Sequence, residues 1–294
     1  MRNKGKWCLV FLLFLGAVAV AQPVSMQGAL EWDTMKLTAV LSLDLGSANI
    51  KLPAGRTLGE TLIGSDYFQL VSPSILAIQA DSSSTLEDLL NQGYMDLHQI
   101  EEIAHNARRM PPFLSPDLLS LSASYVIDLE DISTALISHS RPVEVRRTLN
   151  PVSVPVYTGL IIIADSPLPV HGMRSPALAV PCLFPRIWDS DMNLIYERNM
   201  LETGRKTMAN YAPSRSIFQD TSSGLSPEIT ALVGQRPLRI IASGLYGTNP
   251  TDFIIDSEDA LGIISSQENR RLLSQGRVLF ILNDSQLKKS LGDG

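Results

Sequence analysis

Two stretches of alternating apolar and polar residues constrain the fold more than any other feature of this sequence. Between Lys36 and Leu45 every second residue is leucine or alanine, and the residues between them are mostly polar. The stretch Leu119–Ile127 alternates in the same way. A period of two residues is typical of a β-strand with one buried face. The nearly continuous apolar run over residues 156–164 indicates a further strand near the centre of a sheet.

Helical patterns are interleaved with these strands. Helices are predicted over residues 57–62, 85–107 with a break at Gly93, 132–138, 201–211 and 257–273. Further strands are predicted near residues 75–79, 177–188, 193–197, 238–246 and 277–282. No strict strand–helix repeat joins them, so the predicted fold class is α+β, with mixed or antiparallel sheets and packed helices.

The domain organisation is predicted from shifts in composition. Prolines at positions 142, 151 and 155 favour a connector between two related α+β modules. The predicted segments are a signal peptide (1–21), a loose N-terminal segment (22–35), a first module (36–140), the connector (141–155), a second module (156–283) and a polar tail (284–294).

The first residues have the pattern of a secretory signal. Three basic residues precede an apolar run over residues 7–20, and Ala19 and Ala21 are the small side chains that a signal peptidase accepts. We expect cleavage after Ala21 and a periplasmic or outer-membrane-associated protein. An uncleaved anchor is the alternative, although the run is shorter than the roughly 20 residues of a membrane-spanning helix. No later stretch is predicted to span a membrane.

Charge and cysteine content exclude several classes of protein. The chain has 24 Lys+Arg against 30 Asp+Glu, a net charge of −6, which argues against a broad nucleic-acid-binding surface. Of its two cysteines, Cys8 lies in the signal segment, so only Cys182 would remain after cleavage. A single cysteine cannot form an internal disulfide. We expect Cys182 to be buried, with an intermolecular disulfide as the alternative.

No arrangement of residues predicts catalysis, a cofactor or a metal. The sequence contains neither G-x-S-x-G nor a phosphate-binding glycine loop. Asp189, Asp191 and Asn193 resemble the start of a calcium loop, but the glycine and glutamate that such a loop needs are replaced by Leu194 and Met200. A turn between two strands is therefore predicted.

Two places are candidates for contact with a partner. His171 lies in a loop between two prolines, where functional contacts are common. Arg270 and Arg271 come near the end of the last predicted helix and would suit an acidic partner. The alternative for the arginines is a solvated helix end, where cations are favoured by the helix dipole.

A set of positions in the second half matches a known family pattern: Thr158, Gly159, Pro185, Asp189, Thr251, Asp252 and Asp259. With these positions, roughly residues 150–283 resemble the FlgP-like family of bacterial envelope lipoproteins. The resemblance implies a non-enzymatic envelope protein built from small α+β modules that oligomerise, in some members as disks around the flagellar motor. This chain departs from the family because no lipid-accepting cysteine follows the predicted cleavage site.

These observations predict an exported structural or assembly component of the cell envelope. It would self-associate as a homo-oligomer, bind protein partners in the envelope and not nucleic acid, and use no cofactor; the resemblance extends this to a flagellum-associated role. The first alternative is a periplasmic module that binds a small ligand in an apolar pocket. An enzyme of unrecognised type is the second.

Overall fold

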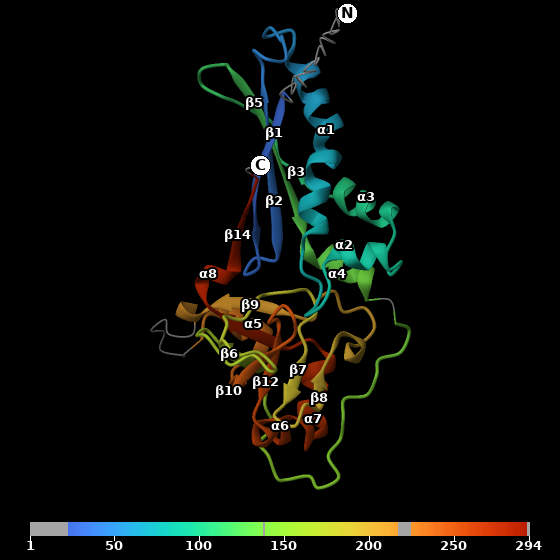
Figure 1. Cartoon of the computed structure of the whole chain (residues 1–294), viewed down its shortest axis with the longest axis vertical. Coiled ribbons are helices and arrows are strands. Elements are labelled where there is room, and N and C mark those ends of the chain that lie inside the picture. The colour runs from blue at the N-terminus through green and yellow to red at the C-terminus, as the bar shows by residue number, and fades with distance from the viewer. Residues whose placement is uncertain (1–22, 138, 217–224, 293–294) are drawn as a thin grey trace, which may run out of the picture.

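The computed structural model describes residues 23–137, 139–216 and 225–292. The predicted cleavage residues Ala19 and Ala21 lie outside this part of the chain. The fold is α+β, as the sequence predicts: helices pack on three sheets that contain both antiparallel and parallel strands. The molecule is elongated, with the N-terminal module at one end and the second module at the other (Figure 1).

The N-terminal module is built on an antiparallel sheet with the strand order β14-β1-β2-β5-β3, and β4 also pairs with β5. The two alternating stretches form its central pair, β2 and β5, and every second residue of each is buried, which confirms the sequence prediction. The strands are β1 (Val24–Glu31), β2 (Lys36–Asp44), β3 (Arg108–Arg109), β4 (Phe113–Leu114), β5 (Ser120–Asp128) and β14 (Lys288–Leu291).

One long helix, α1 (Arg56–Leu76), covers a face of this sheet (Figure 1). The helix predicted at 57–62 lies within α1 but is much too short, and the strand predicted at 75–79 is wrong, because α1 continues to Leu76. The buried residues Ile63, Tyr67, Val71 and Ile75 recur every four positions, which is the spacing of one helix face. Gly59 lets α1 approach the sheet, because a β-carbon there would lie 3.0 Å from the side chain of Leu121.

Three shorter helices complete the module: α2 (Leu86–Asn91), α3 (Leu97–His105) and α4 (Leu129–Leu136). The predicted break at Gly93 is confirmed, and its φ of +76° is one that glycine adopts without strain. Thr85 and Asp88 form a reciprocal capping box at the start of α2. The helix predicted to reach residue 107 ends at His105, and Arg108 and Arg109 form β3.

The second module contains two four-stranded sheets, one parallel (β10-β6-β13-β9) and one mixed (β11-β12-β7-β8). The apolar run at 156–164 provides β6, an interior strand as predicted. The strands are β6 (Leu160–Ala164), β7 (Ile187–Asp189), β8 (Leu194–Tyr196), β9 (Asn210–Pro213), β10 (Leu238–Ile241), β11 (Gly244–Tyr246), β12 (Asp252–Ile255) and β13 (Val278–Leu282). The helices are α5 (Pro227–Val233), α6 (Ser257–Ile264) and α7 (Gln267–Ser274).

Several predicted elements of this module are shorter or of another type. The helix predicted over residues 201–211 is wrong: a glycine with a φ of +88° at position 204 interrupts it, and its end becomes strand β9. The helix over 257–273 is two helices, because the hydroxyl of Ser266 caps a second start. The strand predicted over 238–246 divides into β10 and β11. Of the strand predicted over 177–188, only residues 187 and 188 lie in a sheet, at the start of β7.

Both ends of the described chain form strands rather than the predicted loose segment (22–35) and polar tail (284–294). Strand β1 occupies residues 24–31, and α8 (Asp284–Leu287) leads into β14, which pairs with the second half of β1. Strand β14 is a short edge strand that is held by backbone pairing with β1 and contains Lys288 and Lys289. Sequence periodicity does not reveal β14, because none of its four residues is buried.

The buried carboxylate of Asp252 joins the two modules. Its oxygens accept hydrogen bonds from the hydroxyl of Ser82 (3.1 Å) in the N-terminal module, and from the Trp188 indole and Arg186 amide (both 3.2 Å) in the second. The Arg186 guanidinium lies 3.9 Å away. Thr251 and Asp252, two of the positions that carry the family resemblance, are both fully buried. Docking of the modules therefore adds the Ser82 hydroxyl to the two donors that the second module itself supplies to this carboxylate.

Asp252→Asn should lower the free energy of unfolding by about 2 kcal/mol, because an amide group would face donors that need an acceptor. Denaturant unfolding followed by circular dichroism measures this. Asp256→Asn is the matched control, since Asp256 is exposed and makes no side-chain cap; it should change stability by less than about 0.5 kcal/mol. Equal effects of the two substitutions would contradict the role of Asp252.

Burial raises the pKa of Asp252, although hydrogen bonds from Arg186 and Trp188 oppose the shift. A raised carboxyl pKa means that the folded state holds its proton to higher pH than the unfolded state does. Stabilisation from the protonated carboxyl is then complete below the ordinary aspartate pKa and falls as pH rises through the raised value. The wild type should therefore lose part of its advantage in free energy of unfolding over Asp252→Asn as the pH rises from the ordinary aspartate pKa through the raised pKa of Asp252. An advantage that grows with pH would contradict the raised pKa.

Candidate functional site

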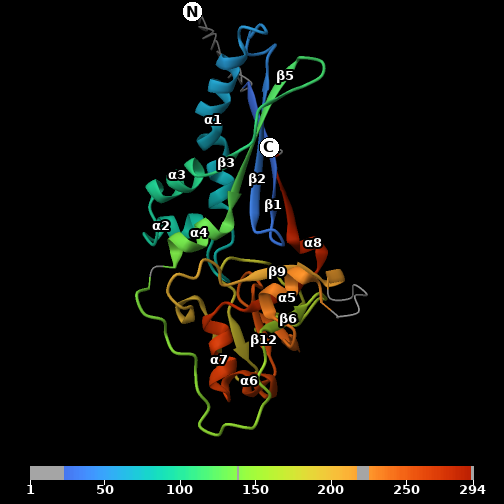
Figure 2. The ribbon, with the colours of Figure 1, turned by 180° about the vertical axis from the view of Figure 1, so that it is seen from behind.

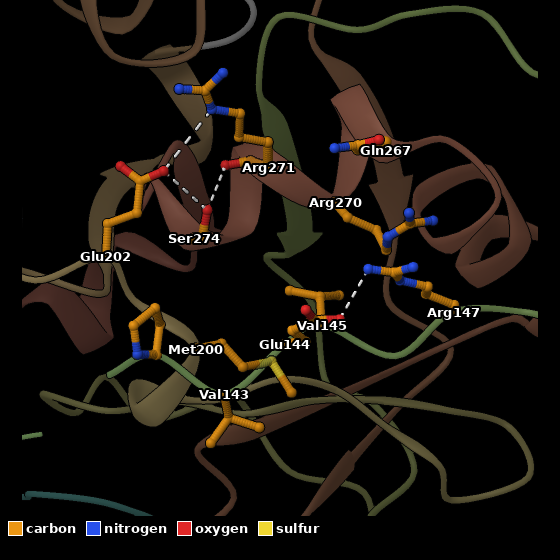
Figure 3. A pocket seen from close by; sticks show the side chains of 11 residues that line it. Val143, Glu144, Val145, Arg147, Met200, Glu202, Gln267, Arg270, Arg271 and Ser274 are labelled. Atoms are coloured by element: carbon orange, nitrogen blue, oxygen red, sulfur yellow. Dashed lines mark hydrogen bonds and ion pairs between the residues drawn. The ribbon is translucent and has the colours of Figure 1, made fainter. Parts of the chain in front are cut away.

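A groove lies between the connector and helix α7 of the second module (Figure 3). Its volume is about 270 Å³. We call it the connector groove. Its lining residues are Pro142, Val143, Glu144, Val145, Arg147, Met200, Glu202, Gln267, Arg270, Arg271 and Ser274. One wall is therefore irregular chain, and the other is a helix face.

The connector is held in place although it contains no helix or strand. Its Val143 amide donates a hydrogen bond to the Asn199 carbonyl (2.7 Å). At its far end, the buried Asn269 of α7 donates from its side-chain amide to the Pro155 carbonyl (3.0 Å). Val145 is buried against the module between these two points. These contacts fix the wall of the groove.

Arginines dominate the rim of the connector groove. Arg147 pairs with Glu144 at 2.9 Å, and Arg271 lies 3.8 Å from Glu202. Arg270 instead donates to the Ile264 carbonyl at 2.6 Å, which leaves its charge without a carboxylate partner among the described residues. Figure 3 shows the guanidinium groups of Arg147 and Arg270 turned toward one another. Two facing cations favour an anionic group between them.

The floor of the groove is apolar, formed by Val143, Val145 and Met200. The arrangement can hold a segment that presents an apolar side chain together with carboxylates. The structure thus brings Arg270 and Arg271, both predicted from sequence, into one groove. It adds Arg147, which the sequence analysis missed because the prolines of the connector indicated only a boundary.

The third predicted contact residue does not line the groove. His171 lies on an exposed loop, where its amide donates to the Leu245 carbonyl and its ring lies 6.0 Å from that of Tyr246.

The family-like positions have structural roles. The Thr158 hydroxyl donates to the Val233 carbonyl and accepts from the Arg236 amide. A β-carbon on Gly159 would lie 2.5 Å from Val233, so no larger residue fits there. Pro185 is buried, and burial raises the pKa of Asp259 at the start of α6.

The Asp189 side chain closes the turn between β7 and β8. It accepts hydrogen bonds from the amides of Asp191 (3.0 Å) and Asn193 (2.8 Å), and from the side-chain amide of Asn193 (2.9 Å). This geometry is that of the predicted turn. Within the part of the chain that the structure describes, no three His, Cys, Asp or Glu residues are grouped so that they could hold a metal ion.

A second, larger cavity has a volume of about 650 Å³. Three cations line it, Arg205, Lys206 and Arg277, with Glu130 of the N-terminal module as the one carboxylate among its lining residues. The Arg277 side chain is held by a hydrogen bond to the Leu232 carbonyl (3.2 Å). We call this the basic cavity. Its Arg205 lies 3.9 Å from Glu202, which lines the connector groove.

Two family models match the chain, and both describe domains of one protein. The model of the N-terminal domain of Treponema pallidum Tp0624 matches residues 23–135, and the model of its second domain matches residues 159–284. No match is found among curated proteins. The residues outside the two matches include the connector wall of the groove and strand β14. No helix in the described ranges is long and apolar enough to cross a membrane.

Cys182 should be unreactive in the folded protein. It is fully buried, as predicted, and burial raises the pKa of its thiol, so the nucleophilic thiolate is disfavoured. Its amide and carbonyl both hydrogen-bond to the Tyr211 hydroxyl. Labelling by a maleimide should be on the order of 100-fold slower in native buffer than in denaturant. A Ser166→Cys variant, with an exposed thiol, is the control; equally fast native labelling of Cys182 would contradict its burial.

Proposed function

We propose that this chain is an exported, non-enzymatic structural or assembly component of the cell envelope that self-associates. The proposal starts from its likeness to the first and second domains of one Treponema pallidum protein, in the same order. The FlgP-like resemblance of the second half extends it to a flagellum-associated role. The observation that carries the proposal is the connector groove, with its arginine rim and apolar floor.

The composition of this groove suits a protein partner. Arginine is enriched in protein interfaces, where its planar group pairs with carboxylates around an apolar centre. Among the groove residues, Val143 is exposed although it is apolar, and Arg147 and Arg271 project into solvent. A docked segment would cover the valine and supply acceptors for the guanidinium groups.

A second copy of the chain offers a matching surface. At the corner between α2 and α3, Tyr94 and Leu97 are exposed, and Glu101 lies one helical turn after Leu97 on the same face. The corner therefore presents apolar side chains beside a carboxylate, which is the complement of the groove. Because corner and groove are different surfaces, repetition of this contact produces a ring or an open filament.

The basic cavity favours the alternative function, a periplasmic module for a small anionic ligand. Its three cations converge on a volume large enough for a phosphate ester or a dicarboxylate. Titration calorimetry with inorganic phosphate distinguishes the two functions. Under this alternative, phosphate binds and an Arg277→Gln substitution weakens the binding. If the chain functions only in assembly, titration with phosphate releases no heat of binding.

Light scattering of residues 22–294 over a range of protein concentrations tests self-association. We expect a discrete oligomer that dissociates as salt is added, because the contact is charged. Arg271→Glu should weaken assembly about tenfold or more, since it places a carboxylate opposite Glu101. The double variant Arg271→Glu with Glu101→Arg should restore assembly, because the charges are exchanged.

Arg174→Glu is the matched control for this charge reversal, since Arg174 is an exposed arginine outside the groove. It should assemble like the wild type. A strict monomer at every concentration would overturn self-association. If Arg271→Glu leaves the oligomer intact, or if the double variant does not restore assembly, the interface lies outside the connector groove.

A further inference from the structure

Five pairs of adjacent basic residues occur along the chain, and one of them differs from the rest in its surroundings. Arg146 and Arg147 lie in the middle of the connector, in exposed chain without helix or strand. We call them the connector pair. The other pairs lie in regular elements or beside a tight turn, where the backbone is not free to enter the active site of a protease. They are 108–109 in β3, 205–206 beside the turn at Gly204, 270–271 in α7 and 288–289 in β14.

The backbone on either side of the connector pair is bonded to the second module only at a distance. On one side the Val143 amide donates to the Asn199 carbonyl, and on the other the Val152 amide donates to the Ser265 hydroxyl (3.3 Å). Between these points, no backbone group of residues 144–151 hydrogen-bonds to another described segment. Figures 1 and 2 show the connector running along the outside of the second module. Such a segment suits an endopeptidase, which holds its substrate as an extended strand.

Proline limits where the connector can be cut. Arg141 is followed by Pro142. A peptide bond to proline resists proteases that cut after basic residues, because the ring removes the amide hydrogen and fixes φ. Arg147 is followed instead by Thr148 and then by Leu149, whose side chain is 97% exposed. The bonds that such a protease can cut in the connector are therefore those that follow the residues of the connector pair.

Few contacts hold the connector pair against the module. The salt bridge of Arg147 with Glu144 joins side chains that are 66% and 80% exposed, and surface ion pairs of this kind add little stability. Val145 is the one buried residue within 144–151. A protease therefore has to lift only this valine from the floor of the connector groove to draw the segment into its active site.

We propose that the connector is a proteolytic processing site, at which an endopeptidase specific for basic residues hydrolyses the peptide bond between Arg147 and Thr148. Water is the co-reactant. It supplies the oxygen of the new carboxylate on Arg147 and the proton that the nitrogen of Thr148 gains when the amide bond breaks. The product is one chain in two fragments, residues 22–147 and 148–294.

The cut does not separate the modules. Strand β14 belongs to the second fragment and pairs with β1 of the first. The Trp32 amide donates to the Leu287 carbonyl across the same boundary, and the Ser82 hydroxyl donates to Asp252. The nicked protein therefore stays together, and it loses only the continuous connector wall of the groove.

The new carboxylate also changes the charge of the connector groove. It forms on Arg147, whose guanidinium group faces that of Arg270 across the rim (Figure 3). An anion supplied by the chain itself then competes with a docked carboxylate for these cations. Processing would thus weaken self-association through the groove. This consequence rests on the proposed function, whereas the cut itself does not.

Limited digestion of residues 22–294 with trypsin, below the concentration at which the chain assembles, tests access to the site. The first cut should fall at the connector pair, and the two fragments should elute together from a size-exclusion column. Arg146→Gln with Arg147→Gln should slow the first cut on the order of 100-fold. Arg205→Gln with Lys206→Gln, which removes another exposed basic pair, is the matched control and should leave the rate unchanged. A first cut elsewhere, or an unchanged rate in the connector variant, would overturn the inference.

Mass spectrometry of the protein recovered from the cells that naturally produce it tests processing itself. Digestion with a glutamate-specific protease leaves bonds after arginine intact, so a peptide that begins at Thr148 can come only from processing. Recovery of the intact chain alone, or of fragments that begin elsewhere, would contradict the proposal. Trypsin should cut Arg271→Glu at the same bond, so failure of the self-association proposal leaves this one testable.

Discussion

The buried carboxylate of Asp252 is the interaction on which the arrangement of the two modules depends. A carboxylate removed from water is stable only if donors surround it. Here the donors are the Ser82 hydroxyl from one module and the Arg186 amide and Trp188 indole from the other. Backbone bonds flank this contact, with the Phe184 amide on the Ala80 carbonyl. Separation of the modules would remove the Ser82 hydrogen bond and the flanking backbone bonds, while the Arg186 and Trp188 donors would stay with Asp252 in the second module.

The path of the chain strengthens this connection. The sheet of the N-terminal module is completed by β14, which the chain adds only after it has built the second module. The second module is thus inserted between two strands of the first. The Trp32 amide donates to the Leu287 carbonyl where the chain returns, and a salt bridge joins Lys288 to Glu31. Consequently the two modules are joined where the chain leaves the N-terminal sheet and again where it returns to it.

The sequence pattern predicted those elements whose residues alternate, or are continuously apolar, within one short segment. Alternation identified β2 and β5, a dense apolar run identified the interior strand β6, and Gly93 marked a real helix break. The misses arise from tertiary structure: β14 is polar and is stabilised by backbone pairing with residues far away in sequence. Asp252 looks like any turn aspartate until the fold surrounds it with donors.

Only part of the candidate site was predictable from the sequence. Arg270 and Arg271 stand out in sequence as adjacent cations on a short helix. Arg147 and Val143 do not, because only the folded connector brings them opposite α7. Function in this protein is therefore argued from surfaces assembled by segments that are distant in sequence.

Differential scanning calorimetry of residues 22–294 and of a chain that ends at residue 283 tests most directly whether the two modules form one unit. The full chain should unfold in a single transition whose calorimetric and van't Hoff enthalpies agree. Loss of α8 and β14 should split this into two transitions or lower the midpoint of the N-terminal module. Two separate transitions in the full chain, or a truncated chain that melts like the full one, would contradict the account.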